Sequence, residues 1–319
     1  MQRNSVDQKA SKFLEQGLTS LKGKTNCSEQ LPLTKIQAES IRSCRSSSGL
    51  LPDCLSANQW RGQILCYYYS YMAFLAASVA DWAGMKAHLD KLQAASKDHG
   101  VSLTDPLKLI AFYVGGVYRQ GVGDLDGALE IFKDSKFDLA HFQSSNLSST
   151  SQILRDLSIM AALNTLLILQ QPARRDHDVN AELVAKIEGI CEHHPNKDVQ
   201  TAFNLVLATI NVNQPLSMIK IKQHLGNALS GAQATMNIQL LCITLNVMCN
   251  KFFANVAGEQ AEKSAMAASY QAKKSGNTLW KSVAEGMLAK AYDMNGKKEE
   301  AAKTFEQARR MAQLAMPES

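Results

Sequence analysis

A glycine- and lysine-containing stretch near the start of the chain is the first whose residue types could perform chemistry. Gly17, then Gly23, Lys24 and Thr25, resemble a phosphate-binding P-loop. That motif requires four residues between its glycines, whereas this chain has five, and no strand precedes the stretch to support a cradle of backbone amides. We therefore expect no nucleotide site here, and no cofactor elsewhere.

A possible metal site lies at Cys191, His193 and His194. At a helix end these side chains should point in different directions, and no second pair of ligands follows at a usable spacing. We therefore favour a polar helix terminus over a zinc site. Cys242 and Cys249 are seven residues apart and therefore share one helix face, where buried thiols usually behave as small apolar groups. We expect no metal and no redox chemistry.

Signatures of nucleophilic catalysis are also missing from the sequence. It has no GxSxG motif, no recognisable catalytic cysteine neighbourhood and no glycine loop of the oxyanion type. The paired acids Glu299 and Glu300 fit a solvated helix start, where they complement the helix dipole. We therefore predict that the chain is not an enzyme.

Composition favours a large helical protein. The chain has 319 residues, 45% of them hydrophobic, with only 18 glycines and 7 prolines. Its net charge of +5 is dispersed, which argues against a nucleic-acid footprint. Seven cysteines without a CxxC motif indicate a reducing compartment. No signal peptide opens the chain, and the longest apolar runs, 71–80 and 159–169, are too short to span a bilayer, so we expect a soluble protein.

The elements that would position functional residues are clearest in residues 279–311, LWKSVAEGMLAKAYDMNGKKEEAAKTFEQARRM. The pattern predicts two amphipathic helices folded back on each other. We expect Ala289 and Ala301 to let the two backbones approach, and Tyr292 and Phe305 to fill the gap. The spacing matches the 34-residue tetratricopeptide pattern at six positions: Leu288, Ala289, Tyr292, Ala301, Phe305 and Ala308.

The same arrangement recurs at residues 123–132, where Ala128 and Phe132 are four residues apart, as Ala301 and Phe305 are. Turn signals fall at intervals of roughly 35 to 45 residues, as in helical solenoids, and no segment alternates with period two. We predict an all-α fold, a tetratricopeptide-like right-handed α-solenoid of stacked antiparallel helix pairs over residues 56–319. Residues 1–55 form a helical segment, either a cap or the edge of missing repeats.

In a tetratricopeptide array the first helix of each pair lines the concave side. By that register, five residues should face inward: Lys290, Asp293, Asn246, Asn250 and Arg119. Tyr67, Tyr68 and Tyr71 could add aromatic anchors for a partner. Ordinary packing between helices is the alternative for these tyrosines.

The string NTLWKSVAEGMLAKAYDMNGKKEEAAKTFEQA at residues 277–308, with the degenerate helical pairs before it, resembles the tetratricopeptide subunit of the cohesin-loading complex in its fungal form. Members of that family are generally longer, so the resemblance places this chain at their C-terminal portion. It implies a non-enzymatic adaptor that wraps the extended N-terminal segment of the HEAT-repeat loader subunit, of the adherin or Nipped-B type.

The resemblance further implies a nuclear protein that supports cohesin loading and sister-chromatid cohesion, with cohesin and chromatin as indirect partners, no small-molecule substrate and no membrane. Two alternatives remain. One is a scaffold subunit of another assembly, such as a proteasome-lid-like complex or a generic tetratricopeptide adaptor. The other is a regulatory region cut from a catalytic chain.

Overall fold

The computed structural model describes residues 57–101, 105–139, 149–171, 177–192, 194–210 and 217–316. The predicted N-terminal segment and the P-loop-like stretch at Gly17 lie outside these residues. Within them the chain forms twelve α-helices, one 3-10 turn and no strand, so the predicted all-α class is confirmed.

The helices follow one another along the chain with short connections. They are α3 (Ala57–Ser78), α4 (Trp82–Asp98), α5 (Asp105–Gly121), α6 (Leu125–Phe132), the 3-10 turn η1 (Ser135–Phe137), α7 (Ser149–Leu169), α8 (His177–Cys191), α9 (Lys197–Thr209), α10 (Met218–Ala234), α11 (Ile238–Phe253), α12 (Glu259–Ser275), α13 (Thr278–Met294) and α14 (Lys298–Ala315).

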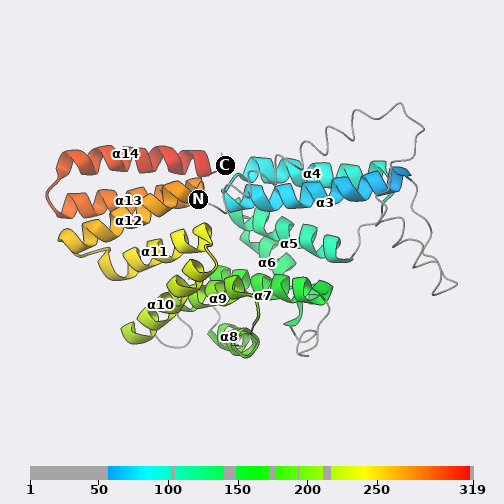
Figure 1. The fold of residues 1–319 in the computed structure, drawn as a ribbon, viewed down its shortest axis with the longest axis horizontal. Coiled ribbons are helices and arrows are strands. Elements are labelled where there is room, and N and C mark those ends of the chain that lie inside the picture. Colours follow the sequence, from blue (N-terminus) through cyan, green and yellow to red (C-terminus); the bar gives the residue numbers. More distant parts are fainter. Residues whose placement is uncertain are drawn as a thin grey trace.

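Neighbouring helices pack in a regular order that gives the molecule its curvature. Each odd-numbered helix from α3 to α13 contacts the helix that follows it, and each from α3 to α11 also contacts the next odd-numbered helix. Each even-numbered helix from α4 to α12 also contacts the odd-numbered helix after it. The pairs therefore succeed one another along an arc, as Figure 1 shows, which is consistent with an α-solenoid.

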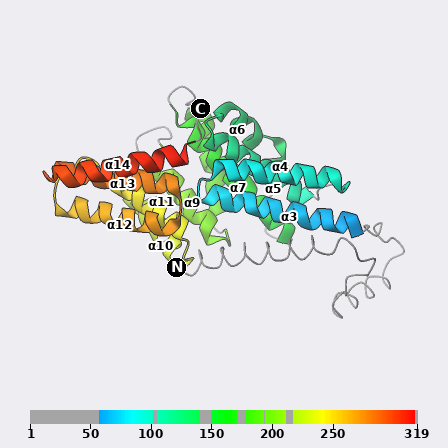
Figure 2. The same cartoon turned by 90° about the horizontal axis from the view of Figure 1, so that it is seen from above.

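The first and last described pairs meet end to end, as both views show (Figures 1 and 2). Trp82 at the start of α4 donates its indole N–H to the Ala315 carbonyl at the end of α14, 3.0 Å away. Asn277 Nδ2 donates to the Ser78 carbonyl at 2.9 Å. These bonds join residues about two hundred positions apart in the chain and close the arc at its ends.

Short polar side chains cap the starts of several helices, and glycines occupy the turns between helices. The Asp81, Asp124 and Asn277 side chains accept hydrogen bonds from the backbone N–H groups of Gly84, Gly127 and Trp280, and so cap α4, α6 and α13. The turns before α6 and α14 each contain a glycine at positive φ, Gly123 at 87° and Gly296 at 78°. The turn followed by a second helix, which the sequence predicted at both places, is therefore present in the structure.

Phe305 does not fill the gap between α13 and α14, as the sequence had led us to expect. Its side chain is 62% exposed, whereas the corresponding Phe132 of α6 is 3% exposed. Helix α7 follows α6 and contacts it, so Phe132 is enclosed in a core with Tyr113 and Phe137. Helix α14 is the last described helix, so no later described helix covers Phe305.

Helix α7 is the one described helix long and apolar enough to cross a membrane, over Gln152–Leu169. The apolar run of this helix that the sequence shows, at 159–169, is shorter than that span. In the structure α7 packs against α5, α6, α8, α9 and η1, and Ile159, Leu163 and Leu166 are fully buried. Length and composition alone would fit a membrane span, but its packing is that of a core helix.

A buried carboxylate joins α12 to α13. Glu285 is 3% exposed, and its Oε1 atom accepts a hydrogen bond from Ser269 Oγ at 2.8 Å. Lys273 Nζ lies 2.7 Å from the same oxygen. Because a buried carboxylate is stable only when it is paired, these contacts fix the position of α13 on α12.

Candidate functional site

A pocket of about 210 Å³ lies between α11, α12 and α13, and we call it the α11–α13 groove. Its floor is apolar and includes Cys249, Ala261, Ala265 and Met287. Gly286 also lines it, and a Cβ built there would meet no other atom within 4 Å among the described residues. The missing side chain leaves room for a side chain of another molecule.

The groove has a polar rim, and two residues predicted from the sequence lie on it. Asn250 of α11 and Lys290 of α13 both line the pocket and both are exposed. Lys290 Nζ donates to Asn255 Oδ1, 2.8 Å away in the connection between α11 and α12. An apolar floor with an ammonium group and an amide at its edge suits an extended peptide, whose carbonyls accept hydrogen bonds while its apolar side chains are buried.

Two of the predicted partner residues are not accessible. Asn246 is 1% exposed and its Nδ2 atom donates to the Cys242 carbonyl one turn earlier, at 2.8 Å. Tyr68 is 8% exposed and packs edge to face on Tyr69, with ring centroids 5.2 Å apart. The expected exposure of Asn246 is therefore wrong, because its side chain lies within the packing between helices. For Tyr68 the burial fits the alternative of ordinary packing between helices.

The other predicted residues are exposed but lie outside the groove lining. Asp293 forms an ion pair with Lys298 at 2.6 Å, and Arg119 forms one with Asp124 at 3.5 Å. Each pair spans the turn of its own hairpin. Tyr67 and Tyr71 are 51% and 41% exposed on α3. Binding by these four residues stays a prediction.

Among the groove residues that were not predicted from the sequence are Phe253, Val283 and Gly286. Gly286 and Val283 lie four and seven residues before Lys290, so helical spacing from Lys290 would have found them. Phe253 likewise follows Asn250 by three residues. The missed signal was the continuation of the same face along each helix.

A larger pocket of about 430 Å³ lies among η1, α7 and α8. Its charged side chains largely pair with each other. Lys186 Nζ is 2.7 Å from Glu182 Oε1, and the nearby Lys136 Nζ is 3.0 Å from Asp134 Oδ2. None of the residues predicted to bind a partner lines it. Its mixed and internally paired charges favour no particular ligand, so we give preference to the α11–α13 groove.

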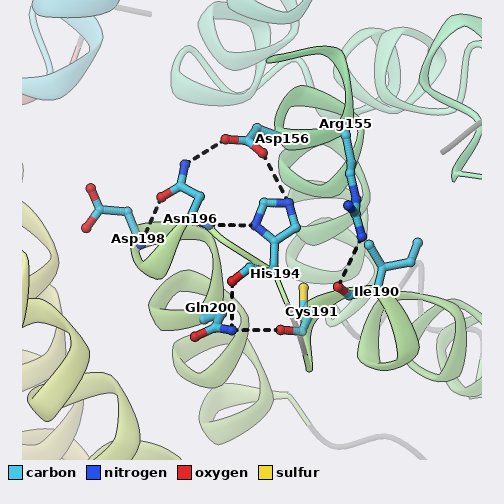
Figure 3. Close-up of polar contacts among 8 residues, drawn as sticks. All are labelled: Arg155, Asp156, Ile190, Cys191, His194, Asn196, Asp198 and Gln200. Carbon is cyan, nitrogen blue, oxygen red and sulfur yellow. Dashed lines mark hydrogen bonds and ion pairs between the residues drawn. The ribbon is translucent and has the colours of Figure 1, made fainter. Parts of the chain in front are cut away.

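The suspected metal ligand His194 belongs instead to a hydrogen-bond network where α7, α8 and α9 meet (Figure 3). His194 Nε2 lies 3.2 Å from Asp156 Oδ1, and its Nδ1 accepts from the Asn196 backbone N–H at 3.2 Å. Asn196 Nδ2 donates to the other Asp156 oxygen at 2.6 Å, and Gln200 Nε2 donates to the His194 carbonyl. Both ring nitrogens are used, so a polar helix terminus is confirmed.

No group of three or more His, Cys, Asp or Glu side chains suited to a metal ion occurs in the described part of the chain, which does not include His193.

We expect His194→Ala to destabilise the protein by about 2 kcal/mol, because Asp156 and the Asn196 N–H would each lose a buried partner. Urea denaturation measures this change. The matched control Glu192→Ala, an exposed residue at the same helix end, should change stability by less than about 0.5 kcal/mol. A fall in melting temperature on adding a zinc chelator to the wild type would contradict the structural role.

The buried thiols should be unreactive in the folded protein. Burial raises the pKa of Cys191 to about 12, and raises the pKa values of Cys242 and Cys249 to about 11. At pH 8 these thiols are therefore protonated, and the thiolate is the reactive form. We expect iodoacetamide at pH 8 to leave all three unmodified in native protein and to modify them in urea, as peptide mass spectrometry would show. Rapid native modification of Cys191 would contradict its burial.

A protein-family model described as cohesin loading factor matches residues 1–299, which is most of the chain. A search of curated proteins and a search of solved structures found no match. The matched range includes α3 to α13 and the whole α11–α13 groove.

Proposed function

Because the chain belongs to the cohesin loading factor family, we propose that it is a non-enzymatic scaffold that holds an extended segment of the HEAT-repeat loader subunit. Membership of the family implies a role in loading cohesin onto chromatin, and hence in chromosome segregation in the nucleus. It also implies interaction with the loader and with cohesin. Our proposal adds three points to this. The HEAT-repeat subunit is the direct partner, the segment of it that binds is extended, and this chain acts as a scaffold.

The observation that carries the proposal is the α11–α13 groove. Its apolar floor can bury side chains of a peptide, while Asn250 and Lys290 can hydrogen-bond its backbone carbonyls. An extended segment loses conformational entropy when it binds, so it needs contacts over many residues. The regular order of helix contacts supports tetratricopeptide-like stacking. We propose that this stacking is right-handed and that it continues the groove over neighbouring pairs.

The family match favours this function over a subunit of a proteasome-lid-like assembly. The test is a titration of the purified 319-residue chain into the fluorescently labelled N-terminal segment of the HEAT-repeat subunit, followed by anisotropy. We expect saturable one-to-one binding, and no saturation with a segment of the same composition in scrambled order. Absence of saturable binding by the native segment would overturn the proposal.

A further inference from the structure

Lys290 is the one charged side chain among the described residues that line the α11–α13 groove. Its Nζ atom donates to Asn255 Oδ1 at 2.8 Å, the oxygen of a neutral amide in the connection between α11 and α12. A carboxylate in that position would form a stronger, charge-assisted bond with the ammonium group. Lys290 therefore has the capacity for a stronger partner than the one it has.

The carboxylates of the groove helices are all paired with other lysines. Helices α11, α12 and α13 contain four acidic residues, all of them in α12 and α13, and the connections between these helices contain none. Each of the four forms an ion pair: Glu259 with Lys263, Glu262 with Lys297, Glu285 with Lys273 and Asp293 with Lys298. Within this described part of the chain, the positive charge of Lys290 is therefore left without an acidic partner.

The space beside Lys290 suits a side chain of a peptide rather than a whole small molecule. The groove holds about 210 Å³, less than the roughly 300 to 1,000 Å³ of typical small-molecule sites. It is open at Gly286, where a Cβ would meet no described atom within 4 Å, and its floor includes the buried Cys249 and Ala265. An apolar side chain can therefore fill it.

The spacing of residues along α13 matches that of an extended chain. Lys290 follows Gly286 by four residues, which is about 6 Å along a helix axis. In an extended peptide, side chains two residues apart point to the same side and lie about 6.6 Å from each other. A peptide whose apolar side chain lies beside Gly286 therefore places the side chain two positions away next to Lys290.

We propose that the α11–α13 groove recognises an extended segment in which an aspartate or glutamate lies two residues from an apolar side chain. The carboxylate replaces Asn255 as the acceptor for Lys290, and the apolar side chain occupies the space beside Gly286. Asn250 remains on the rim to bond a backbone carbonyl. This inference rests on the proposed function for the identity of the partner, and it adds the chemistry by which the groove selects one part of the partner's segment.

Substitutions of Lys290 test the ion pair, by anisotropy of the labelled N-terminal segment of the HEAT-repeat subunit. Lys290→Gln should weaken binding about tenfold, and Lys290→Glu more strongly, because a charge-assisted bond is lost and then replaced by repulsion. Lys290 is exposed, so both variants should keep the wild-type circular dichroism spectrum and melting temperature. The matched control is Lys303→Gln on the exposed side of α14, outside the groove, which should bind as the wild type does.

Substitutions in the segment identify the residue that Lys290 contacts. Each aspartate of the segment is replaced in turn by asparagine, and each glutamate by glutamine. One of these variants should bind the wild-type chain about tenfold more weakly, and should cause little further loss with Lys290→Gln, since the two groups act as a pair. Replacing the apolar residue two positions from it by serine should weaken binding to both chains equally.

The outcomes separate the carboxylate contact from the proposed function. If the wild-type chain binds the segment saturably and Lys290→Gln binds it equally well, the carboxylate contact is wrong and the proposed function stands. The same holds if no acidic residue of the segment is coupled to Lys290, or if the coupled residue has no apolar residue two positions away. Absence of saturable binding by the wild-type chain would overturn both.

Discussion

Replacing Gly286 with tryptophan is expected to weaken binding of the HEAT-repeat segment by about 30-fold or more, the effect of losing a central contact of an interface. Gly286 lines the α11–α13 groove, and the space beside its Cα is open. An indole there would occupy the pocket that receives the partner's side chain. Glycine is also a poor helix former, so the substitution should leave α13 intact. Anisotropy with the labelled segment measures the loss.

Gly226 of α10 offers a matched control. It is also a helical glycine, and a Cβ built there would likewise meet no other described atom within 4 Å. It does not line the groove. Gly226→Trp should therefore bind the segment with wild-type affinity. If the two tryptophan variants bind equally well, the groove is not the binding site.

The second large effect is expected from Ala289→Trp, which should destabilise the last pair by about 3 kcal/mol or more. Ala289 is 3% exposed and lies two helical turns after Ser282, whose hydroxyl donates to the Ala308 carbonyl of α14. It therefore faces α14, where Ala301 and Ala308 are also buried. An indole at this position forces the two helices apart and should break the Trp82–Ala315 contact that closes the arc.

Hydrogen exchange and urea denaturation would detect this change. Among the described helices α13 and α14 pack along the array only on the α11–α12 pair, and the substitution should also break their end contact with α4. We therefore expect α13 and α14 to open locally before the remaining helices. Partner binding should weaken too, since α13 forms one wall of the groove. The control Ala302→Trp places the same side chain on the exposed side of α14 and should leave stability almost unchanged. Unaltered helicity and melting of Ala289→Trp would contradict the register assigned to α13.

Sequence periodicity predicted helices better than it predicted their faces. The two helices expected within residues 279–311 are present as α13 and α14. Yet α3 carries Arg61 as its one charged residue, and α11 carries only Lys251. Without a clear polar face, periodicity cannot separate the buried side from the concave side. For this reason Asn246 was expected on the exposed face although it is buried, and the sequence left both roles open for Tyr68.

Long-range features were beyond the sequence for a different reason. The exposure of Phe305 depends on which helix follows α14, and the closure by Trp82 depends on the accumulated curvature of all the pairs between. Neither the exposure of Phe305 nor the contact made by Trp82 can be predicted from the sequence pattern of a single helix. In contrast, Asn250 and Lys290 could be predicted together, because each lies at the same position after the asparagine that caps its helix, Asn237 or Asn277, and the pairs stack in order.

The most direct test of the central claim is hydrogen–deuterium exchange of the 319-residue chain with and without the N-terminal segment of the HEAT-repeat subunit. If the segment lies in the α11–α13 groove, exchange should slow in the second half of α11, in its connection to α12, and along α13. Protection confined to the surroundings of the larger pocket at η1, α7 and α8, with α11 and α13 unchanged, would contradict the account.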